Sequence, residues 1–227
     1  MKVTYIAHSG FCVETEKHRL IFDYFRGALD VPEDGKTTVF FVSHFHEDHY
    51  NRAIYDFAGR PDTHYVLSRE IRGWPDGASV TSVRHGETYD VGGVHIMTLC
   101  STDCGVAYLV SVDGEVIYHA GDLHLWVWDG APEMANRRVE RMFRAEIDKL
   151  KGVEINAAFL PLDPRQGADG VRGFDYTMCT LSIKKAFPMH FWETPEYVMS
   201  FVTSPTAAPY RERIVPLTDE GGACVIE

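Results

Sequence analysis

Short apolar runs separated by polar turns predict β-structure along much of the chain. The clearest run, residues 39–42, holds only β-branched and aromatic residues, which is typical of a buried strand. Two later runs are joined by Asp113-Gly114, a strong signal for a two-residue hairpin turn. The expected strands are residues 2–6, 11–15, 19–24, 39–42, 64–67, 94–99, 106–112, 115–118, 155–160, 213–217 and 223–226, with a strand end just before His190.

Helical periodicity is strongest in the second half of the chain. From residue 132 to 151, apolar side chains recur at helical spacing, which predicts one long amphipathic helix. The segment 165–174 carries three glycines, so we expect a mobile loop that acts as a lid or contacts substrate. Shorter helices are expected at 51–58, 176–185 and 196–202, with a single helical turn at 68–71. The pattern as a whole indicates a mixed α/β protein.

Length and charge limit the function classes. A chain of 227 residues with 45% hydrophobic content can bury one large core, so we expect a single domain over residues 1–227. The 22 Lys and Arg residues against 33 Asp and Glu residues give a formal charge of −11. Such a charge repels phosphate backbones and anionic membrane surfaces, so neither nucleic acid nor membrane is expected as a partner.

Cysteine usage and hydropathy predict the compartment. The five cysteines are scattered and include no Cys-x-x-Cys pair, which argues against a disulfide framework and for a reducing environment. No apolar run approaches the roughly 20 residues of a membrane span, and residues 1–10 lack a signal-peptide core. We therefore expect a cytoplasmic protein with a small-molecule substrate; a homo-oligomer is compatible with the sequence.

The densest cluster of candidate chemistry follows the strand at 39–42. His44 and His46 are two residues apart, which points both imidazoles to one side of an extended segment, and Asp48 and His49 follow in the turn. Neutral imidazole and carboxylate are ligands that divalent transition metals take at neutral pH. Because these ligands exceed the need of one ion, we predict a binuclear site with ions about 3.5–4 Å apart.

The motif His44-x-His46-x-Asp48-His49 resembles the signature of the metallo-β-lactamase superfamily of hydrolases. That family's later features appear in order, with Asp122 in a Gly-Asp pair and His190 near the C-terminus. The resemblance implies a four-layer αβ/βα sandwich of two β-sheets flanked by helices, with metals along one edge. Residues 5–11 and 20–23 also resemble the start of a small bacterial branch of the family that includes L-ascorbate 6-phosphate lactonase.

One position departs from the family pattern. The third histidine is missing, because no histidine lies between His95 and His119, and residues 100–105 read Cys-Ser-Thr-Asp-Cys-Gly in its place. Asp103 is the natural replacement, and Cys104 is the alternative. The departure leaves open which metal the first site prefers.

The resemblance also implies roles for individual residues. Asp48, Asp122 and His8 are the expected catalytic residues, using a metal-bridging hydroxide that attacks a carbonyl or phosphorus. The expected cofactors are two divalent ions, zinc or manganese, with iron as a further candidate. Asp122 would bridge two ligand sets: His44, His46 and Asp103 for one ion, and Asp48, His49 and His190 for the other.

Several neighbouring residues have two interpretations. Asp23, at a predicted strand end, would either orient a ligand imidazole or cap a turn. Trp126 and Trp128 follow Asp122 closely and would either pack in the core or wall a substrate pocket. His119 and His124 are further candidates as proton donors or orienting groups, although burial in the core is the simpler expectation for His119.

Three functions agree with these patterns. The first is a metal-dependent hydrolase of a small polar substrate such as a sugar-phosphate lactone or another ester, with Arg165, Arg172 and Lys184 as phosphate contacts. The second is a phosphodiesterase or nuclease, which the negative charge disfavours. The third is a metal-binding sensor without turnover, suggested only by the missing histidine.

Overall fold

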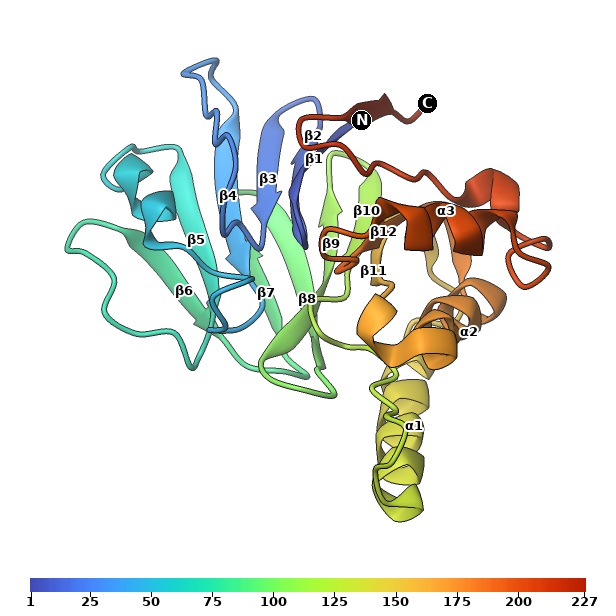
Figure 1. Cartoon of the computed structure of the whole chain (residues 1–227). Helices are drawn as coiled ribbons and strands as arrows, with labels where there is room; N and C mark the ends of the chain where they lie inside the picture. Colours follow the sequence, from blue (N-terminus) through green and yellow to red (C-terminus); the bar gives the residue numbers. More distant parts are fainter.

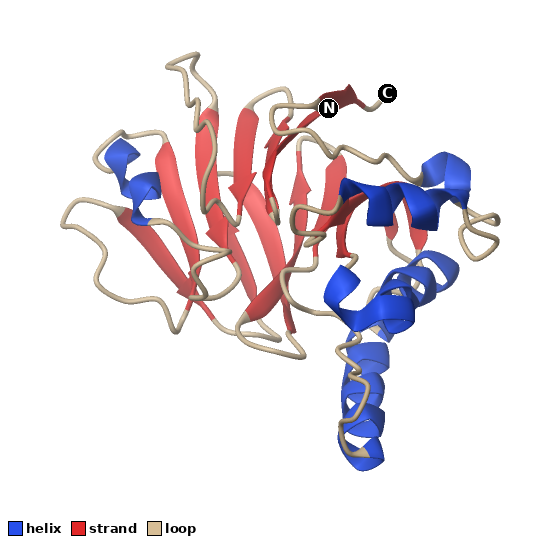
Figure 2. Cartoon of the chain, viewed as in Figure 1, coloured by secondary structure: helices blue, strands red, loops and turns tan.

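Two mixed β-sheets packed face to face form the centre of the molecule (Figures 1 and 2). The computed structural model describes residues 1–227. The first sheet has the order β13 (Ala223–Val225), β1 (Lys2–Ala7), β2 (Gly10–Glu14), β3 (His18–Phe22), β4 (Thr37–Val42), β5 (Thr63–Ser68) and β6 (Ser79–Val83). The second has the order β12 (Ser182–Met189), β11 (Glu154–Pro161), β10 (Glu115–His119), β9 (Val106–Val112), β8 (Val94–Cys100) and β7 (Thr88–Val91).

Each sheet joins an antiparallel meander to a parallel group. In the first sheet β1, β2 and β3 pair antiparallel, and β3 to β6 pair parallel. In the second sheet β7 to β10 pair antiparallel, while β10, β11 and β12 are parallel. The expected hairpin at Asp113-Gly114 is confirmed, since both residues adopt positive φ and Val112 pairs with Glu115.

Helices cover the outer faces unequally. The helices α1 (Glu133–Asp148), α2 (Arg172–Thr180) and α3 (Pro195–Thr203), with the 3-10 helices η2 (Pro164–Val171) and η3 (Arg211–Arg213), lie on the side of the second sheet (Figure 1). One 3-10 helix, η1 (Arg52–Phe57), covers the first. The predicted sandwich of two sheets with outer helices is confirmed, with a thin outer layer on the first sheet. No helix has both the length and the apolar composition to cross a bilayer.

Successive side chains along β4 point to opposite faces of the sheet and so belong to two separate apolar layers. Phe41 points into the large core between the sheets, whereas Phe40 joins a smaller cluster under η1. Phe22 stacks on Phe41 with ring centroids 4.7 Å apart and on His119 at 5.0 Å. Each such aromatic pair contributes about 0.5–1.5 kcal/mol beyond its burial. The simpler expectation for His119, a packed core residue, describes its environment.

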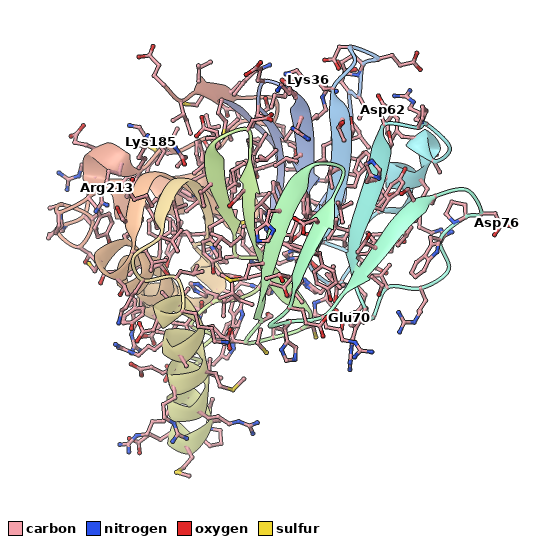
Figure 3. The ribbon with its side chains drawn as sticks, turned by 180° about the vertical axis from the view of Figure 1, so that it is seen from behind. Lys36, Asp62, Glu70, Asp76, Lys185 and Arg213 are labelled. Carbon is pink, nitrogen blue, oxygen red and sulfur yellow. The ribbon has the colours of Figure 1, made fainter.

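The predicted helix at 176–185 is wrong in both boundaries. Helix α2 begins earlier, at Arg172, and residues 182–189 form the edge strand β12, which pairs with β11. The sequence misleads here because lysines favour helices, whereas pairing with β11 and burial of alternate side chains decide the structure. Lys185 and Arg213 lie together at this edge (Figure 3), where Arg213 donates to the Ile183 carbonyl at 3.1 Å.

Other local predictions need smaller corrections. The expected mobile loop at 165–174 is helical, because Asp163 caps η2 by accepting from the Arg165 backbone N–H at 2.8 Å. The helix expected at 51–58 is the 3-10 helix η1. The expected helical turn at 68–71 is a single turn, closed by the Ile71 N–H donating to the Ser68 carbonyl at 2.9 Å. The strand expected at 213–217 is wrong, since only Ile214 forms a bridge, and β6 and β7 were not predicted.

We predict that Asp113→Asn reduces the free energy of unfolding by about 1–2 kcal/mol at pH 7. The Asp113 carboxylate joins the sheets by accepting from Thr15 Oγ1 at 2.6 Å, the Lys17 backbone N–H at 2.9 Å and His18 Nδ1 at 2.9 Å. Although burial raises it, the His18, Thr15 and Lys17 hydrogen bonds lower the pKa of Asp113 to about 2.

Because the folded state holds this pKa below its unfolded value, the stabilisation is complete above about pH 4 and is lost as pH falls towards 2. Urea unfolding at several pH values measures this free energy of stabilisation. The variant should therefore lose part of the acid dependence, whereas Asp90→Asn, at an exposed ion pair with His95, serves as the control. Equal stability of Asp113→Asn and wild type at pH 7 would contradict the prediction.

Candidate metal centre

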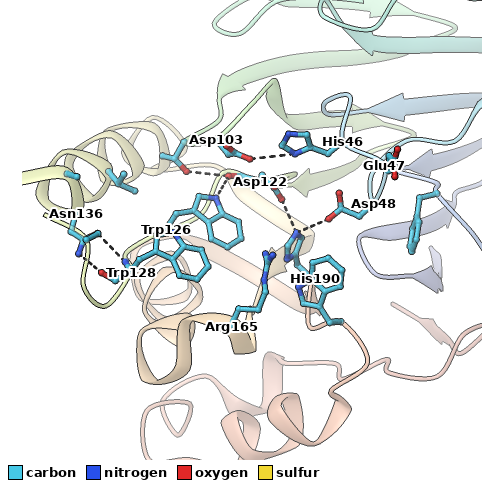
Figure 4. A pocket seen from close by; sticks show the side chains of 16 residues that line it. His46, Glu47, Asp48, Asp103, Asp122, Trp126, Trp128, Asn136, Arg165 and His190 are labelled. Carbon is cyan, nitrogen blue, oxygen red and sulfur yellow. Dashed lines mark hydrogen bonds and ion pairs between the residues drawn. The ribbon is translucent and has the colours of Figure 1, made fainter.

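Polar side chains from distant parts of the sequence meet at one edge between the two sheets (Figure 4). Each follows the end of a strand or lies in a turn between strands, where the backbone leaves the sheet. The convergence comes from His8 after β1, the segment 44–49 after β4, Asp103 after β8, Asp122 after β10 and His190 after β12.

These side chains form two groups. Within each group, one ligand atom from every residue lies within 4.8 Å of the others. The structure therefore brings together all residues that the sequence suggested as ligands, and it adds His8, which we had expected as a catalytic residue. The first group is His44, His46, Asp103 and Asp122, and the second is His8, Asp48, His49 and His190.

Asp122 lies between the two groups. Its Oδ1 is 3.2 Å from His49 Nε2 and 3.4 Å from His190 Nε2, whereas its Oδ2 is 3.5 Å from His44 Nε2. The backbone reaches this position through Gly121 at φ +49, where a Cβ would stand 2.7 Å from the Cβ of Ser43. The Gly-Asp pair is therefore required by space, and one carboxylate faces both groups.

Buried donor atoms without partners mark the centre. His8 Nε2, His49 Nε2, His190 Nε2 and Asp122 Oδ1 are buried and have no hydrogen-bond partner. Such orphan atoms are rare in proteins, because an unsatisfied buried polar group costs about 1–3 kcal/mol. A divalent cation would satisfy all of them at once, and imidazole nitrogen with carboxylate oxygen is a suitable donor set.

Hydrogen bonds on the far side hold the imidazoles in place. His49 Nδ1 donates to Asp23 Oδ2 at 2.8 Å, and His190 Nδ1 donates to Asp163 Oδ2 at 2.9 Å. These bonds leave each Nε2 facing the centre. Of the two interpretations of Asp23, the orienting hydrogen bond is therefore observed. Asp163 was not predicted from the sequence, although its place just after β11 gives the same strand-end signal.

Strained backbone also gathers here. His8, Asp23 and His190 are among the five non-glycine residues with positive φ, at 55°, 41° and 62°. Each such residue costs about 1–3 kcal/mol, and such strain is typical of functional sites. The left-handed turns aim these side chains inward from strands that would otherwise carry them past the centre.

The protonation states suit metal binding. Burial lowers the pKa of His8 and His44 to about 4, so both imidazoles are neutral at pH 7. Burial raises the pKa of Asp122, but His49 and His190 outweigh this effect and hold it well below its usual range. Burial lowers the pKa of His49, but Asp122 and Asp23 raise it well above its usual value. A cation at His49 Nε2 would take the place of that proton.

The structure separates the two alternatives for the missing histidine. Asp103 Oδ2 lies 3.7 Å from His46 Nδ1 and belongs to the first group, whereas Cys104 does not. Burial, together with the neighbouring Asp103 charge, raises the pKa of the Cys104 thiol to about 11, which disfavours the thiolate that a metal would need. His124 also lies outside both groups, with its Nε2 3.0 Å from Gln166 Oε1.

A cavity of about 870 Å³ opens beside the two groups (Figure 4). Trp126 and Trp128 line it together with Phe25, Trp192 and Arg165, so the tryptophans are pocket residues. Two of the three expected phosphate contacts are elsewhere. Arg172 pairs with Asp169 and Glu140, and Lys184 is exposed on β12, so neither lines the cavity. Both predictions failed because Arg172 begins helix α2 and Lys184 lies in a strand, whereas a loop and a helix were expected there.

Comparisons with known proteins agree with this centre. The chain is 31% identical over 150 residues to a UPF0173 metal-dependent hydrolase of Bacillus licheniformis, covering 56% of this chain and 64% of that relative. It is also 27% identical over 216 residues to a UPF0173 metal-dependent hydrolase of Thermococcus kodakarensis, covering 84% of each chain. The chain thus spans less than two thirds of the length of the first relative.

Two solved structures share the fold. Igni18, a metallo hydrolase from Ignicoccus hospitalis, aligns with a TM-score of 0.69 at 18% identity, covering 100% of this chain and 98% of the other. The metallo-β-lactamase fold protein YhfI from Bacillus subtilis aligns with a TM-score of 0.67 at 11% identity, covering 98% of both.

Residues 2–129 match the family model described as the Beta-lactamase superfamily domain. Since this match covers more than half of the chain, the chain belongs to the β-lactamase superfamily.

Proposed function

We propose that this chain is a metal-dependent hydrolase that cleaves a lactone or another ester of a small molecule. The observation that carries the proposal is the set of buried donor atoms without partners around Asp122, next to a cavity large enough for a substrate. The relatives named metal-dependent hydrolases support the same class.

The two groups would hold the ions. His8 would join the second set, and Asp122, whose carboxylate lies near both His44 and His49, would serve both sets. When bound, divalent ions in such a site supply Lewis acidity that polarises a substrate oxygen and lowers the pKa of water from 15.7 to about 7. The chain's own contribution is to fix the donor atoms and to shape the cavity.

Asp48 is suited to orient the attacking water. Its Oδ2 lies 3.4 Å from His8 Nε2 and 3.7 Å from His190 Nε2, and the residue lines the cavity. Burial raises the pKa of Asp48, but the nearby imidazoles of His8, His49 and His190 outweigh it and hold this pKa well below its usual value. A carboxylate with so low a pKa is a weak base, so it acts by accepting a hydrogen bond.

The replacement of an imidazole by Asp103 affects the choice of metal. Two imidazoles with carboxylates form a harder donor set than three imidazoles, which shifts relative preference from zinc towards manganese or ferrous iron. Zinc still has the higher intrinsic affinity, so metal availability decides which ion is bound. The cavity does not favour a nuclease, because Arg165 is the one lysine or arginine that lines it.

We predict that Asp122→Asn lowers hydrolysis by roughly 10³-fold while the fold remains intact. An amide has nearly the same shape as the carboxylate, but it lacks the charge that would face both ions. The measurement is turnover of lactone, thioester and phosphodiester panels with zinc, manganese or iron. Asp129→Asn, exposed on the same loop, is the control. Wild-type turnover by a folded, metal-loaded Asp122→Asn variant would exclude the bridging role.

We predict that Asp103→Ala lowers metal affinity at one of two sites by at least about tenfold, whereas Cys104→Ala leaves it unchanged. Asp103→His should raise zinc retention, because it restores an imidazole. Metal analysis and calorimetric titration of chelator-treated protein measure both effects without activity. Normal metal content in Asp103→Ala with loss in Cys104→Ala would instead identify the thiol as the ligand.

A further inference from the structure

Two stacked tryptophan rings line the cavity next to the candidate metal centre. The rings of Trp126 and Trp128, which we call the Trp wall, are stacked with centroids 6.1 Å apart and planes 7° from parallel. The Trp126 ring lies 5.5 Å from the His190 ring, and its Nε1 donates to the Asp122 carbonyl at 2.9 Å (Figure 4). The Trp wall therefore lies directly beside the candidate metal centre.

Side chains from two helices fix this wall. Asn136 on α1 accepts from the Trp128 backbone N–H at 3.1 Å and donates to the Trp128 carbonyl at 3.0 Å. Gln166 on η2 donates to the carbonyls of Leu125 and Val127, both at 2.9 Å. The segment has no regular secondary structure, yet its backbone is held at several points.

Burial does not explain the position of Trp128. The residue is 39% exposed, and the small residues Ala131 and Ala135 line the cavity beside it. A large aromatic side chain that is exposed on a backbone held in place gains little from the core. It does provide a pre-organised surface on which a ligand ring can stack with little loss of conformational entropy.

The cavity offers little to a phosphate group away from the metal centre. Arg165 is the one lysine or arginine in the lining, and its guanidinium already donates from Nε and Nη2 to Asp163 and lies 4.7 Å from the Trp192 ring. The acidic lining residues are Glu47, Asp48, Asp103 and Asp122.

We propose that the substrate is an ester or lactone attached to a flat apolar ring, which stacks on the Trp wall, and that it is not a phosphorylated sugar. Water adds to the ester carbonyl carbon and the bond to the leaving oxygen breaks, giving a carboxylate, an alcohol or phenol, and one released proton. The reaction rests on the proposed hydrolase function, whereas the ring preference rests on the cavity.

The ring preference can be tested without turnover. Chroman and tetrahydropyran share a six-membered cyclic ether, differ by a fused benzene ring and contain no ester. Titration calorimetry of the metal-loaded chain should give at least about tenfold tighter binding of chroman. Trp128→Ala should remove most of this difference and Trp128→Phe should keep it. Met134→Ala, exposed on α1 outside the cavity lining, should have no effect.

Similar binding of the two ethers, or unchanged chroman affinity in Trp128→Ala, would overturn the ring preference. The matching substrates are dihydrocoumarin and δ-valerolactone, each compared with its rate of hydrolysis by hydroxide, and a phosphorylated sugar lactone. Trp128→Ala should raise KM for dihydrocoumarin about tenfold with little change in kcat, because stacking binds substrate and transition state alike.

The outcomes separate the two proposals. Chroman binding at the Trp wall, with no turnover of any ester, would support the ring preference and reject the hydrolase. Faster turnover of δ-valerolactone or of the phosphorylated lactone than of dihydrocoumarin would support the hydrolase and reject the ring preference.

Discussion

The metal centre depends on the hydrogen bonds that the buried Asp23 carboxylate accepts. This carboxylate accepts from the Ser43 backbone N–H at 2.7 Å and from the Ser43 hydroxyl at 2.6 Å, and it also binds His49 Nδ1. The same Ser43 hydroxyl lies 2.9 Å from His44 Nδ1. One carboxylate at the end of β3 thus fixes the exit of β4 and one imidazole from each group. Without it, a buried charge partner and two ring orientations would be lost together.

Much of this centre could be predicted because strand ends are visible in a sequence. A run of β-branched and aromatic residues shows where a strand stops, and the polar residue that follows must leave the sheet, as at His44, Asp122 and His190. His8 was harder to assign, because its place depends on a left-handed turn between β1 and β2. No periodicity in the sequence reports that backbone angle.

Features that depend on distant partners were predicted poorly. Residues 182–189 contain two lysines and were expected to begin within a helix, yet β11 pairs with them as a strand. That error also misplaced Lys184 as a phosphate contact. The nature of the cavity depends on how Asn136 and Gln166 hold the Trp128 segment, and these contacts join residues 8 and about 40 positions apart. Local sequence does not specify such contacts.

The two ligand groups differ in their access to solvent. His46 and Asp103 have side chains that are 38% and 44% exposed, whereas the side chains of His8 and His190 are 3% and 1% exposed. Water and small chelators can approach the first group through His46 and Asp103, whereas the second group meets the cavity through His190 and through Asp48, whose side chain is 26% exposed. Ions in the two positions would therefore exchange with solvent at different rates.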